Sequence, residues 1–352
     1  MLKIFGKDYS REDQRRFFGD PAAVAGTRRI ELRDGKSKGV RLTQVVTGSG
    51  LMYEVNESRG LDLGRCYFKG LPVSYMGYNN EVAPEYFNGR GDSWLWQYGG
   101  GLMVGCGLTQ IGSPCTDEGE PLPQHGWLSN EPAEWVNVSR EEVDGEDTLV
   151  VCGKVRESKA LSRNVSLTRR VSSRVCSNEI LIEDSVENEG FQRQPLMLLY
   201  HFNIGHPILD AGAKFLSKTE GVQPGNDVAA ARTEPNNEYL GPTPGYGDAV
   251  YFHKLKNENG TSLVGIVNKK INLGLSLEFN ADVLDCFTQW KFTSEGNYVA
   301  GLEPATAYVG GREAERCRGT LKYIEPQQVV KTRLVLRLLT TPDEVGDFEG
   351  KF

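Results

Sequence analysis

Short runs of alternating apolar and polar residues dominate the chain, and glycine, proline, asparagine and aspartate separate them. In the stretch from Leu273 to Phe279, apolar side chains occupy every second position, and glycine, serine and glutamate lie between them. Successive side chains of a strand point to opposite faces, so this pattern predicts a strand with one buried and one water-facing side. Comparable β-branched and aromatic runs lie at residues 40–47, 51–55, 65–70, 148–157, 164–173, 179–188, 249–255, 262–268, 273–280 and 332–339.

Helix signals are sparse beside these strands. Ser10 followed by REDQRRFF predicts one short capped helix near the start, ending before Pro21. The pattern therefore indicates an all-β fold of antiparallel sheets. We expect one continuous β-sandwich domain over residues 1–352, with residues 1–40 forming the helix and lead-in, and a long loop from Thr219 to Gly247.

Charge and cysteine content narrow the class of protein. The net charge is −7 and the pI is near 5.4, which argues against a nucleic-acid or anionic-membrane partner and favours a small ligand. The charged N-terminus and the absence of a long apolar run predict a cytoplasmic location. The 7 cysteines form no CxxC pair, so we expect free thiols and no metal site. The glycine run at 98–108 lacks the Gly-Lys-Ser/Thr ending of a phosphate loop, and no cofactor is expected.

Two of the 4 histidines, His125 and His201, are candidates for chemistry. His125 lies in PQHGWLSNEPAEW, a proline-rich loop in which a ring can meet a ligand. In PLMLLYHFNIGHP, strand alternation places His201 and Asn203 on the same face of an otherwise apolar strand. Buried polar groups need partners, so this pair indicates either a ligand site or a structural histidine bonded to the backbone.

A carboxylate is expected beside an aromatic ring in the C-terminal part of the chain. If residues 293–298 form a hairpin with a four-residue loop, Trp290 pairs with Gly301, and Glu303 lies on the same face as Trp290. An indole beside a carboxylate, with a glycine giving room, is typical of a sugar subsite. The alternative is an ordinary cross-strand contact beside a surface acid.

Three cationic side chains are further candidates. Arg59, in ESRGLDLGRCYFKG, could bind sugar hydroxyls or a carboxylate, although an Arg–Asp pair across the turn is the default interpretation. Lys291 and Arg312 lie near Glu303 in the sequence and would suit an acidic or phosphorylated sugar. We expect both to be solvated surface charges.

Five segments, taken in order, give the chain a resemblance to a known family. They are RGLDLGRCYFKGLPVSY, GGGLMVGCGL, PQHGWLSNEPAEW, LLYHFNIGHP and GLEPATAYVGGREAERCRG. It resembles the aldose 1-epimerase family of galactose mutarotase-like proteins, in an incompletely characterised branch, from about Gly50 to Leu339. The resemblance implies a large antiparallel β-sandwich, the galactose mutarotase-like supersandwich, whose concave face holds a sugar and interconverts its anomers without a cofactor.

The resemblance also implies roles for particular residues. Glu303 matches the base that removes the anomeric hydroxyl proton, His201 the acid that protonates the ring oxygen, and His125 the second, substrate-binding histidine. We therefore expect a protonated histidine beside an ionised glutamate. Asn203, Trp290 and Arg59 are assigned to substrate binding.

Two departures from the family pattern leave alternatives open. The segment GGGLMVGCGL lacks the family's arginine, for which Arg59 could substitute. The spacing around His201 and Asn203 leaves open whether His201 or His125 is the acid. A non-catalytic sugar-binding protein and a metal-dependent sugar isomerase or lyase are the alternative functions.

Overall fold

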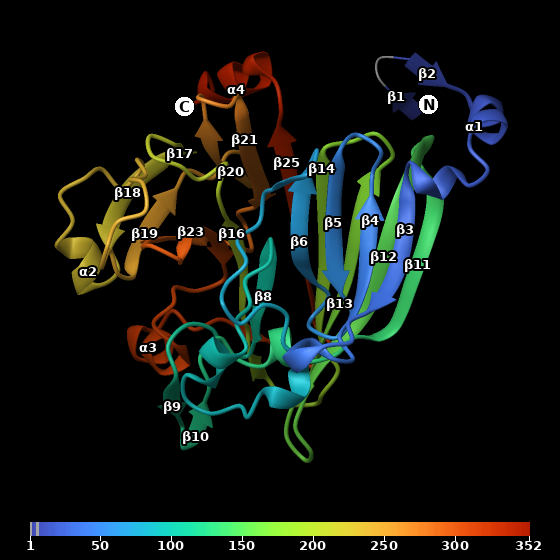
Figure 1. Ribbon diagram of the computed structural model, residues 1–352. Helices are drawn as coiled ribbons and strands as arrows, with labels where there is room; N and C mark the ends of the chain where they lie inside the picture. Colours follow the sequence, from blue (N-terminus) through green and yellow to red (C-terminus); the bar gives the residue numbers. More distant parts are fainter. Residues whose placement is uncertain (1, 5–6) are drawn as a thin grey trace.

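A computed structural model describes residues 2–4 and 7–352, and most of the strands belong to two large antiparallel sheets that face one another (Figure 1). The larger sheet has the strand order β18 (Thr219–Pro224), β19 (Ala249–Leu255), β22 (Cys286–Thr293), β23 (Tyr298–Ala305), β16 (Met197–Ile204), β8 (Met103–Leu108), β6 (Asp62–Phe68), β5 (Leu51–Asn56), β4 (Arg41–Val46) and β3 (Gly26–Glu31), with β7 (Leu71–Pro72) pairing β6.

The second sheet has the order β11 (Glu134–Val143), β12 (Glu146–Ser158), β13 (Asn164–Arg174), β14 (Glu179–Asn188), β25 (Val329–Leu339), β21 (Leu273–Asn280), β20 (Thr261–Asn268) and β17 (Lys214–Ser217). Small two-stranded sheets pair β1 (Leu2–Ile4) with β2 (Lys7–Tyr9), β9 (Cys115–Asp117) with β10 (Glu120–Leu122), and β15 (Gln194–Pro195) with β24 (Tyr323–Ile324). The helices are α1 (Arg11–Phe17), α2 (Asp227–Ala230), α3 (Arg312–Arg318) and α4 (Pro342–Glu349).

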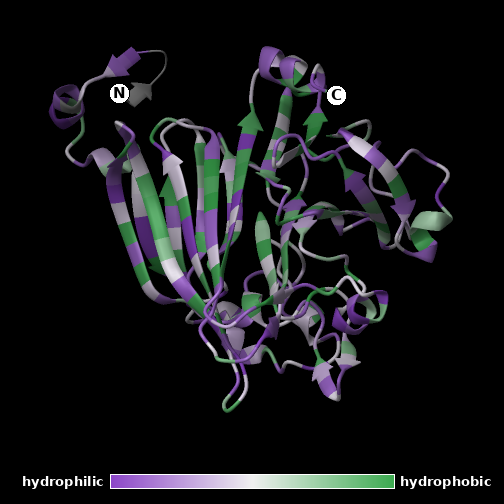
Figure 2. Ribbon diagram, turned by 180° about the vertical axis from the view of Figure 1, so that it is seen from behind, coloured by the Kyte–Doolittle hydropathy of each residue, from purple (hydrophilic) through white to green (hydrophobic). Residues whose placement is uncertain are grey.

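Alternating side chains from both sheets meet in one main core. Tyr53 and Phe202 of the larger sheet belong to the same buried cluster as Leu167 and Leu277 of the second sheet. Figure 2 shows hydrophobic and hydrophilic residues interleaved along the strands, as expected when only one face of each strand enters a core. The predicted all-β fold is confirmed.

Every run that the sequence analysis predicts as a strand overlaps a strand of the structure, although the runs at 40–47 and 65–70 extend one or two residues beyond it. The N-terminal helix is also confirmed: the Asp13 amide donates to the Ser10 hydroxyl over 3.0 Å, and the Ser10 amide donates to the Asp13 carboxylate over 3.1 Å. This reciprocal pair is a capping box, which explains why a short polar segment becomes helical.

Two local expectations are wrong. The loop predicted from Thr219 to Gly247 begins with edge strand β18 and contains α2, because the backbone of β18 pairs with β19. The face of β21 that carries Gly274 and Ser276, expected to meet water, is buried at those residues. Helix α4 packs beside it, with Phe348 filling the space over Gly265 of the neighbouring strand.

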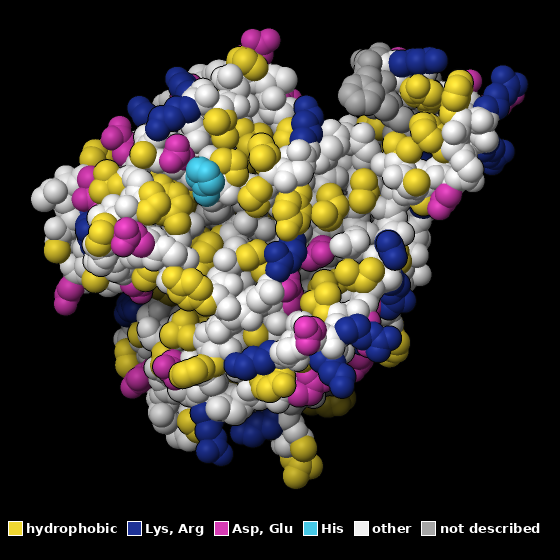
Figure 3. Space-filling view, in the orientation of Figure 1, with side chains coloured by type: hydrophobic (Ala, Val, Ile, Leu, Met, Phe, Trp, Pro, Cys, Tyr) yellow, Lys and Arg dark blue, Asp and Glu magenta, His cyan; other side chains and the backbone are white. Residues whose placement is uncertain are grey.

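The outside of the molecule carries both signs of charge. On the face in Figure 3, basic and acidic side chains are interspersed over most of the surface. Within the described part of the chain, no disulfide bond links any two of the 7 cysteines. Within residues 2–4 and 7–352, none of the helices has the length and apolar character needed to cross a membrane.

Candidate functional site

A cavity of about 670 Å³ lies on the face of the larger sheet that is turned away from the second sheet. Tyr200 and Phe202 of β16 point into the core between the sheets, so His201 between them points the other way and lines the cavity. Strand β23 contributes Glu303 and strand β22 contributes Trp290. Loops before and after β8 form much of the remaining wall, and β19 with the segments that flank it and the loop after β23 complete it.

The predicted hairpin places Glu303 and Trp290 as the sequence analysis expects. Thr293 pairs with Tyr298, Trp290 with Gly301, and Thr288 with Glu303, so the register is confirmed. The room at Gly301 has a specific use: an added Cβ would lie 2.6 Å from Glu303 Oε1 and 2.8 Å from Trp290 Cβ. Glycine therefore leaves space for the protein's own carboxylate and indole, rather than for a ligand alone.

His201 and Glu303 meet at the base of the cavity. The pairing of Phe202 with Leu302 sets β16 beside β23, and His201 Nε2 lies 3.3 Å from Glu303 Oε1. Both side chains are buried, with exposed fractions of 5% and 2%. The two groups that the sequence analysis assigns to proton transfer are thus in direct contact.

Burial shifts both pKa values towards the neutral forms. Desolvation lowers the pKa of His201 to about 4. Desolvation, and secondarily the charge of Asp248, raises the pKa of Glu303 well above its usual value. The expected combination of protonated histidine and ionised glutamate is therefore not what burial favours, because a low-dielectric environment disfavours both charges.

His125 lies beside His201, with the ring centroids 5.9 Å apart, in the proline-rich loop, and its φ is 56°. The Gly112 amide donates to its Nδ1 over 3.3 Å, so the neutral ring carries its proton on Nε2. Desolvation, together with the nearby His201, lowers the pKa of His125 to about 3. Its ring lies against Trp94, with the centroids 4.5 Å apart. His125 is therefore held as a neutral hydrogen-bond donor.

Asn203 is buried behind the cavity wall rather than in it. Its amide nitrogen donates to the backbone carbonyls of Gly101 and His201, and its oxygen accepts the Tyr98 hydroxyl proton over 2.7 Å. Tyr98 lines the cavity and stacks on Trp94. Asn203 thus orients Tyr98 and the end of the strand that carries His201. It does not line the cavity, so the geometry does not support the predicted direct contact of Asn203 with a ligand.

Arg59 does not line the cavity either. Its guanidinium donates to the carbonyls of Ser129 at 2.7 Å and Gln97 at 2.6 Å. The expected Arg–Asp pair across the turn is also wrong, because Asp62 contacts Arg169 instead. These backbone carbonyls accept hydrogen bonds from the guanidinium, so Arg59 connects two loops near the cavity. It therefore does not replace, within the cavity, the arginine that the family pattern has.

Lys291 and Arg312 are buried, although the sequence analysis expects surface charges. Lys291 is 0% exposed on the opposite face of β22 from Trp290, and its ammonium donates to the carbonyl of Glu238 over 2.8 Å. Strand alternation accounts for this placement. Among the residues that the structure describes, no lysine or arginine lines the cavity, whereas two carboxylates, Asp248 and Glu303, do.

Asp248, Tyr98 and Trp94 are cavity residues that the sequence analysis does not identify. The indole Nε1 of Trp290 donates to the Asp248 carboxylate, and burial raises the pKa of that carboxyl. Tyr98 opens the glycine run at 98–108, which is the nearest sequence signal. Nothing in the local pattern around Asp248 distinguishes it from other loop acids.

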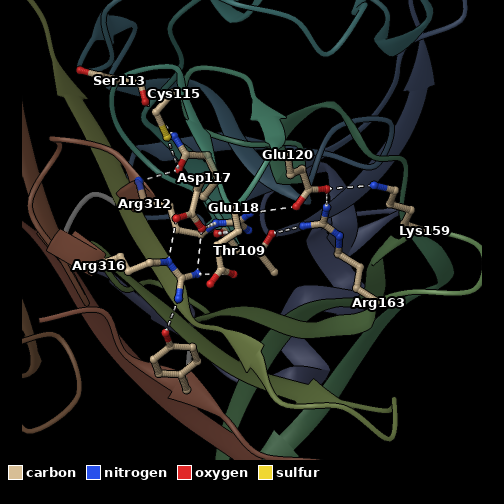
Figure 4. Close-up of polar contacts among 12 residues, drawn as sticks. Thr109, Ser113, Cys115, Asp117, Glu118, Glu120, Lys159, Arg163, Arg312 and Arg316 are labelled. Carbon is tan, nitrogen blue, oxygen red and sulfur yellow. Dashed lines mark hydrogen bonds and ion pairs between the residues drawn. The ribbon is translucent and has the colours of Figure 1, made fainter. Parts of the chain in front are cut away.

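A buried ionic network holds one wall of the cavity (Figure 4). Asp117, in hairpin β9–β10, accepts from Arg312 Nε at 2.8 Å and from Arg316 Nε at 2.7 Å, both on α3. Glu120 bridges Arg312 and Arg163. The same loop supplies His125 just after β10, so the network fixes the base of that wall.

The donor set offers no evident metal centre. Within the described part of the chain, no group of three or more His, Cys, Asp and Glu side chains is arranged to hold a metal ion. The cavity chemistry consists of two histidines, two carboxylates, aromatic rings and neutral hydrogen-bonding groups.

Comparisons with known proteins agree with this architecture. The model of a family described as a domain of unknown function (DUF4432) matches residues 37–338. No curated protein matches the chain. A candidate aldose 1-epimerase from Klebsiella pneumoniae subsp. pneumoniae MGH 78578 is similar in structure, with a TM-score of 0.85 and 28% identity, over 92% of this chain and 85% of that chain.

More distant solved structures share the fold. A galactose mutarotase-like protein from Clostridium acetobutylicum has a TM-score of 0.62 at 13% identity and covers 91% of this chain and 100% of its own. A galactose 1-epimerase from Lactobacillus acidophilus NCFM has a TM-score of 0.58 at 11% identity, over 90% of this chain and 99% of that chain.

Proposed function

Because this chain belongs to the DUF4432 family and has the galactose mutarotase-like fold that its sequence predicts, we propose that it is an isomerase that interconverts the anomers of a sugar. The observation that carries the proposal is the buried contact of 3.3 Å between His201 Nε2 and Glu303 Oε1 at the base of a cavity of about 670 Å³. The similarity to the Klebsiella protein, a candidate aldose 1-epimerase, supports the same reaction class.

The reaction needs one proton donor and one acceptor at neighbouring oxygens. Glu303 takes the proton from the anomeric hydroxyl while His201 protonates the ring oxygen, so the C1–O5 bond breaks and an open-chain aldehyde forms. Rotation about C1–C2 and the reverse proton transfers close the ring on the other face. No net proton is gained or lost, and no co-reactant is consumed.

Burial favours neutral His201 beside protonated Glu303, whereas this step uses protonated His201 beside ionised Glu303. The two arrangements differ only in the position of one proton. Transfer across the contact between His201 and Glu303 interconverts them. A sugar hydroxyl that donates to Glu303 stabilises its carboxylate, and the ring oxygen accepts from His201, so substrate binding favours the reactive charge distribution. His125, with its proton on Nε2, supplies a second donor to the sugar.

The cavity favours a neutral sugar over an acidic or phosphorylated one. Its described lining contains carboxylates and neutral polar groups but no lysine or arginine. A phosphate or carboxylate would enter a desolvated site with no cation to pair with, which costs several kcal/mol. Trp290 offers a flat ring for the C–H face of the sugar, and Asp248 beside it accepts hydroxyl protons.

Saturation-transfer NMR on the purified protein tests the proposal. We expect accelerated exchange between the two anomeric proton signals of a neutral aldose, and at least a hundredfold loss of that exchange in Glu303→Gln, with binding within a few-fold of wild type. The amide preserves the shape of the side chain but cannot accept the proton. His201→Asn and His125→Asn separate the two histidine roles, because the larger loss identifies the acid.

Sugar binding without exchange above the spontaneous rate would reject the enzymatic proposal. Wild-type exchange in Glu303→Gln would remove Glu303 from the mechanism.

A further inference from the structure

The cavity is larger than a single sugar ring requires. A hexopyranose has twelve non-hydrogen atoms, and even at the ~30 Å³ that one water molecule occupies in the liquid, these account for about 360 Å³. The cavity volume is about 670 Å³. With one ring held at His201 and Glu303, a substantial part of the cavity remains for other atoms of the ligand.

The remaining space leads to an apolar rim that is open to water. Tyr78 and Leu95 both line the cavity, yet they are 78% and 48% exposed, in contrast to the buried acid–base pair. Large apolar side chains at the mouth of a cavity lose unfavourable contact with water only when a ligand covers them. We call Tyr78 and Leu95 the rim.

The rim is held in place by the elements that build the site. The side-chain amide of Asn79 donates to the carbonyls of Leu95 at 2.8 Å and Tyr98 at 3.2 Å, which joins the loop of Tyr78 to the segment of Leu95. Tyr78 reaches the turn of the β22–β23 hairpin, since a Cβ added at Gly296 would lie 1.9 Å from its hydroxyl. The tyrosine ring is therefore set beside the hairpin that carries Trp290 and Glu303.

The chemistry of the rim matches a second sugar ring. The described lining offers aromatic faces, the amide oxygen of Asn79 and the amide nitrogen of Asn297 but no cation, which suits hydroxyls and C–H faces rather than phosphates. Only the reducing-end ring of a saccharide can open, so that ring must lie against His201 and Glu303. The ring linked to it then extends towards the mouth.

We propose that the rim is a subsite for a second sugar residue, so that the substrate is the reducing end of a neutral disaccharide or longer oligosaccharide. This inference rests on the proposed anomer exchange for the identity of the first ring. The contact of the second ring with Tyr78 is independent of catalysis.

Matched sugar pairs test the subsite: D-glucose with cellobiose, D-galactose with 1,4-galactobiose and D-mannose with 1,4-mannobiose. Saturation-transfer NMR should give at least one disaccharide a kcat/KM tenfold or more above that of its monosaccharide. Tyr78→Ala should lower kcat/KM for that disaccharide at least fivefold more than for the monosaccharide. The control is Phe191→Ala, which removes a ring that is 89% exposed and outside the cavity lining, and it should change neither value.

Equal kcat/KM within every pair, or an equal effect of Tyr78→Ala on both members, overturns the subsite while leaving the proposed function intact. Ligand-observed NMR on Glu303→Gln separates the two claims. Tighter disaccharide binding that depends on Tyr78, without anomer exchange in the wild type, supports the subsite and rejects the proposed reaction. No binding by either member of any pair rejects both.

Discussion

Individual side chains define the chemistry of this cavity through burial more than through charge pairing. Desolvation lowers the pKa of His201 and raises that of Glu303, so burial favours a pair that holds one proton in an uncharged arrangement. Beside this pair, the Gly112 amide donates to Nδ1 of His125, which favours the neutral form of that ring. The site can therefore transfer a proton in either direction without adding net charge to an apolar environment.

The pH dependence of activity follows from this proton count. Below a pH of about 4, His201 takes up a second proton while Glu303 is still protonated, and the pair no longer contains a base. We expect kcat/KM to fall as the pH falls through about 4 in anomer-exchange measurements from pH 3 to 8. His253, whose pKa burial also lowers to about 4, lies outside the cavity lining, so His253→Gln should retain this acid limb. A fall in kcat/KM centred near pH 6.5 would show that His201 is not desolvated.

Gly301 gives a second prediction at this scale. A methyl group there would overlap Glu303 Oε1 and Trp290 Cβ, both less than 3 Å away. Gly301→Ala should displace the carboxylate, lower kcat/KM at least tenfold and cost about 1–3 kcal/mol of unfolding free energy. Gly221→Ala is the matched strand control, since nothing lies within 4 Å of its added Cβ. Equal activity in the two variants would contradict the proposed position of Glu303.

At the scale of elements, loops with few contacts of their own are held by buried ionic groups. Hairpin β9–β10 is short, yet Asp117 within it is 2% exposed and contacts two arginines of α3. Arg59 similarly joins carbonyls from separate loops behind the cavity. These contacts position loops of the site on the rigid larger sheet.

Asp117→Ala should loosen the wall that carries His125. The change removes one of the two carboxylate partners of the buried Arg312 guanidinium, and breaking such a pair typically costs about 3–5 kcal/mol. We expect thermal unfolding at a lower temperature and, well below that temperature, a KM raised at least fivefold. Lys254→Ala is the surface control, since it removes an ion pair with Glu220 in which both side chains are exposed, and it should leave the unfolding temperature close to that of the wild type. Unchanged KM in Asp117→Ala would separate the network from ligand binding.

For the whole molecule, both large sheets share one main core, and strands distant in the sequence pair within each sheet. Strand β25 lies between β14 and β21, and β16 lies between β8 and β23, so N- and C-terminal halves are interleaved. We therefore propose that the described sandwich is one cooperative unit, as the sequence analysis expects for a single domain.

Calorimetry tests this proposal. A single thermal transition, with equal calorimetric and van't Hoff enthalpies, is the expected result. Two separated transitions would show that the sandwich contains two independently folding units.

The sequence by itself determined most strands of the two large sheets, the capped helix, the hairpin register around Glu303 and the sharing of a face by His201 and Asn203. Each of these depends on local periodicity, turn length or capping, which neighbouring residues specify. Tertiary structure alone decided which side chains meet. It placed Lys291, Arg312 and Arg59 in buried contacts away from the cavity, brought Asp248 beside Trp290, and set His201 against Glu303. Those outcomes depend on pairing between distant strands and on desolvation, which raises the pKa of Glu303 well above the value of an isolated glutamate and lowers that of His201.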